Sequence, residues 1–403
     1  MKILEYSTYI YDNNHIECSK KNTGLGHMVN DIIHALSEYD QVYVLTDAFT
    51  NGFRDEDYVF LSHNYKDIIK NLKLHNIILA ICTMYKYNLS FGNRVREAFS
   101  YINKGYIKRK IKLLNPDIVH IHGVISRNIP IIDVCIELNI PFTLTLHGVI
   151  GDSSTSENNK LSEEKILKKL DDLMIPFSVV STGVKDRVVE KYKLKNIDNI
   201  IVILNGTNKI KYQNNCNVVK KNKYNIICVG NISVNKNQVE VIDAFELLPM
   251  KIQENINIHF FGKILDDSRF LNKIKKHPCN LFYYGSVDRV ELEKYWNVVD
   301  LNILASYDEG FGLSIIEGYL HGVPSIYFAN IDAAQDLYSC SATIIPKSRS
   351  ANDLAEAIIE AYNRKWNKQL IFNHSKKYLM SNIGYQYHCF FKRIVEKKNE
   401  NIY

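Results

Sequence analysis

Short apolar runs alternate with amphipathic stretches along nearly the whole chain. The runs are rich in β-branched residues and end at Gly, Asn or His, which is typical of strands buried in a sheet. In the first half the predicted strands are Ile3–Tyr9, Gln41–Thr46, Ile77–Cys82, Asp117–His122, Phe142–His147, Phe177–Ser181 and Ile200–Leu204. In the second half they are Asn225–Val229, Asn257–Phe261, Leu281–Tyr284, Leu301–Leu304 and Pro324–Tyr327. Strands of this kind joined by helices indicate parallel sheets covered on both faces.

The pattern falls into two halves, which predicts an α/β protein of two doubly wound domains. The stretch Asn205–Tyr224 is polar, rich in Asn and Lys, and weak in periodicity, as expected of a boundary. We therefore expect domains at residues 1–205 and 206–375. Residues 376–403 should form a helical segment that packs back on the first domain. Ligands of such sheets bind beyond the carboxyl ends of the strands, so the motifs at those ends should belong to one site.

Composition excludes several classes of protein. The 403 residues are 46% hydrophobic and 23% charged, with 18 Gly and 8 Pro, which fits a globular chain and neither a disordered nor a collagen-like one. The longest apolar run, Ile77–Cys82, falls far short of the roughly 20 residues that span a bilayer. The start of the chain does not resemble a signal peptide, and the eight scattered Cys residues include no Cys-x-x-Cys pair. We expect a cytoplasmic protein with reduced thiols.

The net charge of +6 is concentrated in one window of the chain. Between Arg94 and Lys112, Glu97 is the one acidic residue, and the basic residues are Arg94, Arg96, Lys104, Lys108, Arg109, Lys110 and Lys112. A nucleic-acid-binding protein would usually be more basic throughout, so we expect no nucleic-acid partner. Apolar residues at helical spacing, Val95, Phe99, Ile102 and Tyr106, run through this window. Two interpretations remain open: a core-packed helix with a solvated face, or a peripheral contact with an anionic membrane.

The strongest motif runs from Asp308 to Glu317, in a loop that opens a helix after the strand Leu301–Leu304. Amide groups at such a helix start can bind an anion, and glycine in the loop lets the ligand approach the backbone. Glu309 and Glu317 flank this point and would suit the hydroxyl groups of a sugar. The alternative is that Ser314 and Glu317 form a capping box with no ligand-binding role.

This segment resembles the E-x7-E motif of the retaining glycosyltransferases of family 4, which have the GT-B fold of two facing Rossmann-like domains. Further motifs of that family match in order and spacing: Asn115-Pro116-Asp117 through His122-Gly123, Asn205-Gly206, Val229-Gly230 through Lys236-Asn237-Gln238, Phe260-Phe261-Gly262 and Tyr284-Gly285-Ser286-Val287. The resemblance covers nearly the whole chain and is most specific in its second half.

The resemblance implies roles for these positions. Glu309 would hold hydroxyls of the donor sugar, Glu317 would bind the ribose, and Lys236 would neutralise the leaving pyrophosphate. His122 would lie near the reacting sugar. Further donor contacts are expected from Gly230, Asn231, Val287, Gly310, Phe311, Gly312, Leu313 and Ser314. The resemblance implies a UDP-sugar rather than a GDP-sugar, no other cofactor and no metal.

Other residues are less clearly assigned. His147, at the end of its strand, could belong either to an acceptor cleft or to the core, and Gly24 and Gly26 are acceptor-side candidates after a long polar stretch. We expect His120 to lie in the core and to point away from His122, which argues against a metal site of His120, His122 and His147. Asn231 stands where the family usually has an arginine.

The expected function is transfer of a sugar from a nucleotide-sugar to a saccharide or lipid-linked saccharide acceptor, in bacterial surface polysaccharide assembly such as O-antigen or capsule. Two alternatives remain: a nucleotide-sugar epimerase of the same architecture, and an inactive family member that serves as a partner subunit.

Overall fold

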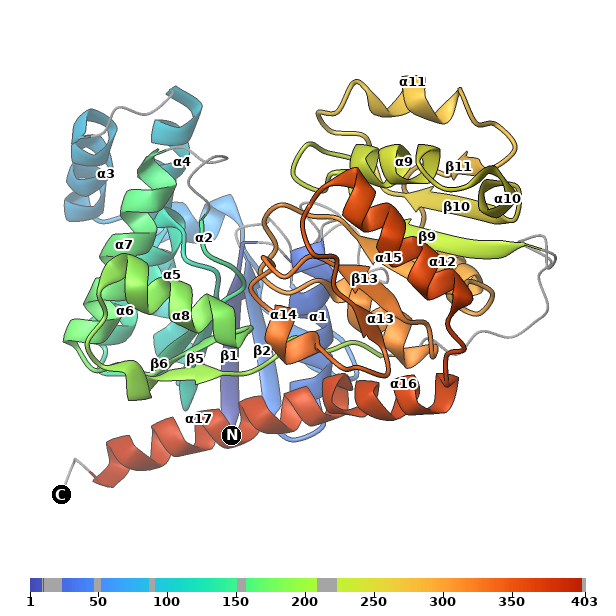
Figure 1. The fold of residues 1–403 in the computed structure, drawn as a ribbon. Coiled ribbons are helices and arrows are strands. Elements are labelled where there is room, and N and C mark those ends of the chain that lie inside the picture. The colour runs from blue at the N-terminus through green and yellow to red at the C-terminus, as the bar shows by residue number, and fades with distance from the viewer. Residues whose placement is uncertain are drawn as a thin grey trace. The chain divides into compact units, whose positions relative to one another are not determined.

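The computed structural model describes residues 1–8, 10, 24–46, 52–86, 91–150, 157–208 and 223–400. The chain divides into two compact units (Figure 1). The first unit contains Met1–Val180, Val184–Leu204 and Met380–Tyr403, and the second contains Ser181–Gly183 and Asn205–Leu379. The C-terminal segment from Met380 therefore belongs to the first unit, although it follows the second in sequence.

The first unit is built on an eight-stranded sheet with the order β3-β4-β2-β1-β5-β6-β7-β8. Neighbouring strands are parallel except for the pair β3 and β4 at one edge. The strands are β1 (Lys2–Ser7), β2 (Gln41–Thr46), β3 (Phe53–Arg54), β4 (Tyr58–Phe60), β5 (Ile118–His122), β6 (Phe142–Leu146), β7 (Phe177–Val179) and β8 (Ile200–Val202). All described residues of β1 and β5 after Lys2 are buried, as the apolar runs predict for strands covered on both faces.

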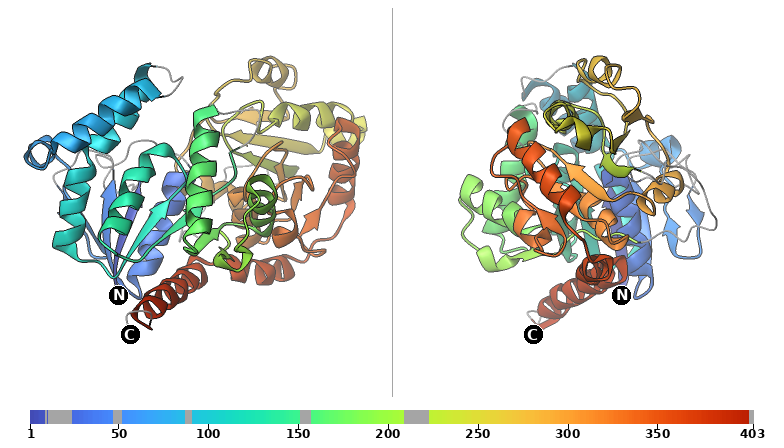
Figure 2. Two further views of the ribbon diagram at one scale, coloured as in Figure 1. Left: turned by 90° about the vertical axis from the view of Figure 1, so that its left-hand side faces the viewer. Right: turned by 45° about the vertical axis from the view of Figure 1, so that its right-hand side comes forward.

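Helices lie on both sides of these strands (Figure 2). They are α1 (Gly24–Ser37), α2 (Tyr65–Lys70), α3 (Leu74–Lys86), α4 (Phe91–Ile102), α5 (Lys104–Leu114), α6 (Ile129–Glu137), α7 (Glu157–Asp172), α8 (Thr182–Tyr192) and α17 (Met380–Glu400). Helix α5 ends where Asn115 adopts a left-handed conformation (φ 47°) and Pro116 follows. The chain then enters β5, the strand that contains His120 and His122.

Two predictions about this unit were wrong. Ile77–Cys82 lies inside α3 and is not a strand, because a short apolar run does not by itself distinguish a strand from a helix. The window from Arg94 to Lys112, in which a single helix was expected, contains parts of two helices, α4 and α5, separated at the buried residue Asn103.

The second unit has a six-stranded parallel sheet with the order β11-β10-β9-β12-β13-β14. The strands are β9 (Tyr224–Val229), β10 (Ile256–Phe261), β11 (Leu281–Tyr283), β12 (Leu301–Leu304), β13 (Ser325–Tyr327) and β14 (Thr343–Ile344). The helices are α9 (Gln238–Glu246), α10 (Met250–Gln253), α11 (Phe270–Ile274), α12 (Arg289–Trp296), α13 (Leu313–Leu320), α14 (Ala334–Leu337), α15 (Ala351–Asn363) and α16 (Lys368–Ser375).

Alternate residues of the second sheet enter two separate cores. Ile226 and Cys228 of β9 pack in a cluster with residues of α9 and α15, whereas Ile227 packs on the other face with residues of α12. Period-two alternation thus buries both faces of β9. The predicted fold class, α/β with doubly wound parallel sheets, is confirmed. Among the described residues, no helix is both long and apolar enough to cross a membrane.

Candidate functional site

The loop after β12 forms a sharp entry into α13 in the second unit. Gly312 precedes the helix with a left-handed φ of 96°. The backbone angle favours glycine, and a Cβ at this position, 2.9 Å from Leu304 Cδ2 and 3.0 Å from Ile315 Cδ1, would also force these two side chains to shift. Phe311 is buried and meets the ring of Tyr378 edge-on, which anchors the loop.

Helix α13 begins at Leu313, and no side chain of the described residues caps its start. The first amide groups of a helix have no intrahelical acceptor, and the helix dipole gives this end a partial positive charge. Ser314 is the second helical residue and so cannot be the N-cap that the capping-box alternative requires. Glu317, one turn further on, lines a small hollow together with Arg289 and His321.

Lys236 and Glu309, which are 73 positions apart in sequence, form an ion pair at this loop. Their side chains are 26% and 20% exposed, so water and small solutes reach the pair. An anion arriving at the helix start would find the ammonium already close by and would compete with Glu309 for it. A carboxylate released in this way can accept hydrogen bonds from hydroxyl groups.

Asn235 ties the two loops of this ion pair together, and the sequence pattern did not single it out. Its backbone carbonyl accepts a hydrogen bond from the Tyr307 amide at 2.8 Å. Its side-chain oxygen accepts from the Asp308 amide at 3.1 Å, and its side-chain nitrogen donates to the Asp308 carbonyl at 3.0 Å. An exposed Asn in a loop carries no periodic signal, so only the fold reveals this role.

Gly230 and Asn231 lie at the end of β9, where the β9 and β10 loops approach closely. A Cβ on Gly262 would lie 2.1 Å from the Gly230 carbonyl oxygen, so the loops fit together only with glycine there. The side-chain oxygen of Asn231 accepts a hydrogen bond from the Lys263 amide at 3.2 Å. At the position where the family usually has an arginine, this chain therefore has a residue that links two loops. Val287 is partly buried against the α12 side of the sheet.

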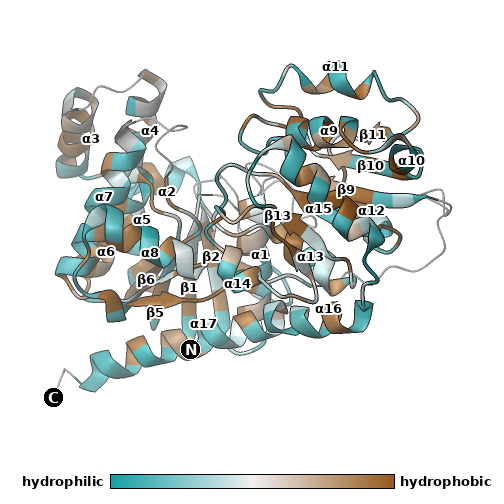
Figure 3. Ribbon diagram, in the orientation of Figure 1, coloured by the Kyte–Doolittle hydropathy of each residue, from teal (hydrophilic) through white to brown (hydrophobic). Residues whose placement is uncertain are grey.

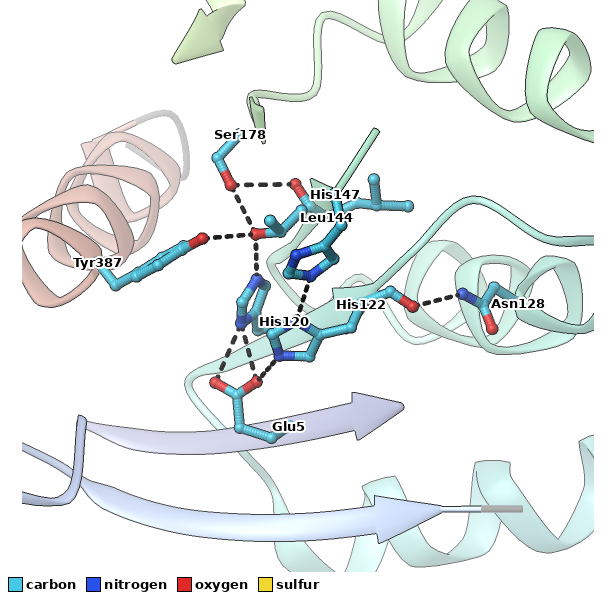
Figure 4. A network of polar contacts seen from close by, with 9 residues as sticks. Glu5, His120, His122, Asn128, Leu144, His147, Ser178 and Tyr387 are labelled. Atoms are coloured by element: carbon cyan, nitrogen blue, oxygen red, sulfur yellow. Dashed lines mark hydrogen bonds and ion pairs between the residues drawn. The ribbon is translucent and has the colours of Figure 1, made fainter. Parts of the chain in front are cut away.

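In the first unit, Glu5 of β1 binds two histidines of the neighbouring strand β5 (Figure 4). The carboxylate accepts from His120 Nδ1 at 2.8 Å and from His122 Nε2 at 2.8 Å. All three side chains are fully buried. His120 Nε2 and the Thr145 hydroxyl share a hydrogen bond of 2.7 Å, and Thr145 also contacts Ser178 and Tyr387. This buried carboxylate is therefore compensated by a connected set of donors.

The prediction that His120 points away from His122 was wrong. Residues two apart on a strand lie on the same face, and the two rings are 4.2 Å apart. Glu5 was missed as well, because one acidic residue inside an apolar run gave no hint of its partners 115 positions away.

His122 also contacts His147, and the hydrogen bonds fix the direction of this chain of groups. His122 Nε2 donates to Glu5, so His122 Nδ1 must accept from His147 Nε2, which is 3.1 Å away. The remaining nitrogen, His147 Nδ1, is buried and has no hydrogen-bond partner among the described residues. His147 Nδ1 is thus a hydrogen-bond acceptor, and His122 and Glu5 fix the orientation of its ring.

Electrostatics in this network favour a charged Glu5 and neutral His122 and His147. Burial opposes ionisation of Glu5, but the electrostatic interaction with His120 and the histidine hydrogen bonds outweigh it and lower the pKa of Glu5 to about 2. Burial and then the electrostatic interaction with His120 lower the pKa of His122 to about 4, against the hydrogen bond to Glu5. Burial and the neighbouring histidines hold the pKa of His147 well below its usual value.

Glu5, His120 and His122 are residue types that bind metals, and their ligand atoms lie within 4.8 Å of one another. Zn–N and Zn–O distances of about 2.0–2.2 Å in a tetrahedron would separate neighbouring ligand atoms by roughly 3.3 Å. The observed 2.8 Å separations are those of hydrogen bonds. As it stands, the cluster fits a proton-linked network better than a metal ligand set.

Gly24 and Gly26 open α1, and Gly26 is buried. The polar stretch before them, residues 11–23, lies outside the described residues. Their acceptor-side role stays a prediction.

Two family models match adjoining parts of the chain. The model of glycosyltransferase family 4 matches residues 23–209, and that of glycosyl transferases group 1 matches residues 211–377. The chain belongs to these glycosyltransferases. The family prediction is confirmed, and the loop–helix site with Lys236 and Glu309 lies in the part matched by the group 1 model.

Curated relatives are similar over parts of their length. An uncharacterized protein of the cps region of Klebsiella pneumoniae is 29% identical over 51% of this glycosyltransferase and 56% of the relative. Poly(glycerol-phosphate) alpha-glucosyltransferase of Bacillus subtilis is 28% identical over 41% of this chain and 25% of its own length. The matched region thus spans little more than half of the Klebsiella protein and a quarter of the Bacillus enzyme.

Solved structures share the fold across nearly the whole chain. Sucrose-phosphate synthase from Thermosynechococcus elongatus matches with a TM-score of 0.73 at 14% identity, over 98% of this chain and 99% of that one. Anabaena HepE, solved in complex with UDP, has a TM-score of 0.67 at 13% identity, over 98% and 100% of the two chains. WaaG, a glycosyltransferase involved in lipopolysaccharide biosynthesis, has a TM-score of 0.63 at 12% identity, over 94% of both. These likenesses support the GT-B fold.

Proposed function

We propose that this glycosyltransferase transfers a sugar from a nucleotide-sugar, a UDP-sugar rather than a GDP-sugar, to a saccharide or lipid-linked saccharide, with retention of configuration. The observation that carries the proposal is the Lys236–Glu309 ion pair beside the uncapped start of α13. It combines a cation and free amide groups for a diphosphate with a carboxylate for sugar hydroxyls. The UDP complex of HepE supports the choice of nucleotide by similarity of fold.

In this proposal each group acts at a different part of the donor. The amides of Leu313 and Ser314 and the Lys236 ammonium bind the diphosphate, and Glu309, released from Lys236, accepts hydrogen bonds from the sugar. Lys236 contributes most as negative charge builds on the leaving group. Glu317 binds the ribose. The acceptor then attacks the face of the ring that the leaving group vacates.

The histidines of the first unit take a supporting part. Both ring nitrogens of His122 are occupied and its side chain is fully buried, so His122 does not contact the sugar directly in this arrangement. We propose instead that His122 acts through His147, whose Nδ1 has no partner in the described part of the chain and accepts a hydrogen bond from a ligand hydroxyl. Glu5 and His122 are then positioning residues.

The names of the relatives support a place in surface polysaccharide synthesis. One is encoded in a capsule region, and another glucosylates poly(glycerol phosphate). A cytoplasmic reaction that extends a cell-surface polymer or its lipid-linked precursor is consistent with both.

Thermal unfolding in the presence of a panel of nucleotides and nucleotide-sugars tests the donor first, because a ligand that binds the native state alone raises the midpoint. Mass spectrometry of products with lipid extract or oligosaccharide acceptors then tests transfer. A glycosylated acceptor supports the proposal. Conversion of the donor into its epimer would favour the epimerase, and donor binding without any turnover would favour the inactive subunit.

Metal independence is part of the proposal, since Lys236 occupies the phosphate-neutralising position. We expect activity to survive EDTA treatment. Loss of activity in EDTA that Mg²⁺ or Mn²⁺ restores would contradict it.

A further inference from the structure

A basic cavity lies on the first unit where the turn between α2 and α3 passes over α5. Its volume is about 610 Å³, and its lining includes six basic side chains: Lys70, Lys73, Lys104, Lys108, Arg109 and Lys112. The turn approaches α5 closely because residue 105 is glycine; a Cβ there would lie 2.2 Å from the Asn71 carbonyl oxygen. The cavity is therefore a product of the fold, with Lys70 and Lys73 brought beside α5 from a separate stretch of sequence.

The charges of this cavity are mostly uncompensated by its own lining. Glu137 is the one carboxylate among the described lining residues, and it binds Lys104 at 2.5 Å and Lys108 at 2.7 Å. The hydrogen bonds from these two lysines lower the pKa of Glu137 to about 2, so it stays charged. Lys70, Lys73, Arg109 and Lys112 are exposed around the same cavity. An anionic group has four accessible cations to bind there.

An exposed apolar face of α3 begins at the edge of this cavity. Leu74, Ile78, Ile81 and Tyr85 are 73%, 50%, 50% and 87% exposed. Their spacing of four, three and four residues places them in one stripe of the helix. Figure 3 shows α3 as a largely hydrophobic helix. An apolar stripe that is exposed to water usually marks a binding surface for a protein, a membrane or a ligand.

The apolar stripe predicted from the sequence, Val95 to Tyr106, is not this surface. Tyr106 is 1% exposed, and its hydroxyl donates to the Ser62 carbonyl, so this part of the predicted stripe belongs to the core. Four basic residues of the charge window, Lys104, Lys108, Arg109 and Lys112, line the cavity. The exposed apolar stripe lies on α3, in which Ile77–Cys82 was predicted to be a strand.

We propose that α3 and the basic cavity together form a docking surface for an anionic phospholipid membrane. Phospholipid phosphates would occupy the cavity, and the stripe of Leu74, Ile78, Ile81 and Tyr85 would enter the interface between headgroups and acyl chains. Clustered lysine and arginine beside an apolar helical face match the two parts of such a membrane, its negative headgroups and its apolar interior. A nucleic acid would use the charges but leave the apolar stripe in water. This proposal is independent of the transfer reaction.

Vesicle co-sedimentation of the full chain provides the test, with phosphatidylcholine vesicles compared with vesicles that also contain phosphatidylglycerol. The charge variant replaces Lys70, Lys73, Arg109 and Lys112 with Gln and leaves the Glu137 pairs intact. At about fivefold per cation near an anionic surface, we expect it to bind at least a hundredfold more weakly to the anionic vesicles. Added salt should weaken wild-type binding as the charges are screened.

A control variant carries the same change in net charge elsewhere. Lys165, Lys195, Lys251 and Lys276 are exposed lysines outside the cavity, and their replacement with Gln should leave vesicle binding within a few-fold of wild type. The stripe variant, Leu74→Gln with Tyr85→Gln, changes the two most exposed stripe residues, so folding should be preserved, as circular dichroism can check. We expect this variant to bind about tenfold more weakly, because its buried apolar area is reduced.

The outcomes separate the alternatives. Weaker binding of both the charge and stripe variants, with an unchanged control, supports the membrane surface. Equal loss in the charge variant and the control would show a general charge effect and overturn the proposal. Unchanged binding of the stripe variant would remove the role of α3. Binding of inorganic phosphate at millimolar concentration without any binding to anionic vesicles would identify a soluble phosphate site and also overturn it.

Discussion

The two units each carry a carboxylate paired with a basic partner, but the pairs differ in access to water. Glu5 in the first unit is fully buried and bound by His120 and His122. Glu309 in the second unit is 20% exposed and bound by Lys236 at a loop. A buried charge must keep its partners, because nothing else can solvate it. An exposed pair can exchange its partner for a ligand at little cost.

The difference in exposure distinguishes a carboxylate that can only position neighbouring side chains from one that a ligand can reach. The Glu5 network ends at His147 Nδ1, which has no partner among the described residues, so in the proposed function its influence on a ligand passes through a single imidazole. In the proposed function the Lys236–Glu309 pair, which is partly exposed, offers both of its charges to a ligand directly. We therefore expect changes at Glu5 to affect stability first and changes at Lys236 to affect turnover first.

The largest expected effect is on the stability of a Glu5→Ala variant. Removal of one partner from a buried ionic network costs about 3–5 kcal/mol, since the remaining groups lose their compensation. Urea unfolding followed by circular dichroism measures this loss. Glu38→Ala, at an exposed acid of the same unit, should change the free energy of unfolding by less than about 0.5 kcal/mol. Similar values for both variants would contradict the distinction between buried and exposed acids.

Lys236→Ala should lower turnover by about 10²- to 10³-fold with little change in stability, because its charge acts on a developing negative charge. Steady-state rates with the donor found by thermal shift test this. Lys263→Ala, an exposed lysine in the same unit, is the control and should keep wild-type turnover. A Lys236 variant that is unstable yet turns over normally once folded would reverse the comparison.

Substitutions of the two glutamates should differ in what they weaken. Glu317→Gln removes charge-assisted hydrogen bonds of roughly 1.5–3 kcal/mol, which lowers affinity for the free nucleotide about 10- to 150-fold. Glu309→Gln should leave that affinity intact and lower turnover of the sugar donor. Calorimetric titration with the nucleotide distinguishes them. Unchanged affinity in Glu317→Gln would remove its ribose role.

The dependence of stability on pH should also distinguish the buried network from the exposed pair. The pKa of His122 is lowered to about 4 from an ordinary 6.5, so the unfolded chain binds more protons between these values. Stability should therefore fall as pH decreases from 6.5 towards 4, by up to ~3 kcal/mol from this group. The lowered pKa of Glu5 adds a further loss below its unfolded value of 4.5. A His122→Gln variant should show a flatter dependence over pH 6.5–5 in urea unfolding, and an equally steep curve would contradict the assignment.

The sequence determined the alternation of strands and helices, the parallel sheets and the loop–helix motif at Glu309. These features depend on local patterns: period-two burial in strands, glycine at Gly312 and a polar loop after an apolar strand. The positive charge of the window from Arg94 to Lys112 could also be predicted, because net charge follows from the residue types alone and does not depend on tertiary contacts.

Tertiary structure decided everything that depends on residues distant in sequence. Pairing of β1 with β5 places Glu5 between two histidines more than a hundred positions away, and Asn235 reaches across 73 positions to the Glu309 loop. Burial also decided between interpretations that the sequence left open. Tyr106 entered the core while the apolar stripe of α3 stayed in water, because neighbouring segments cover one helix face and leave the other exposed.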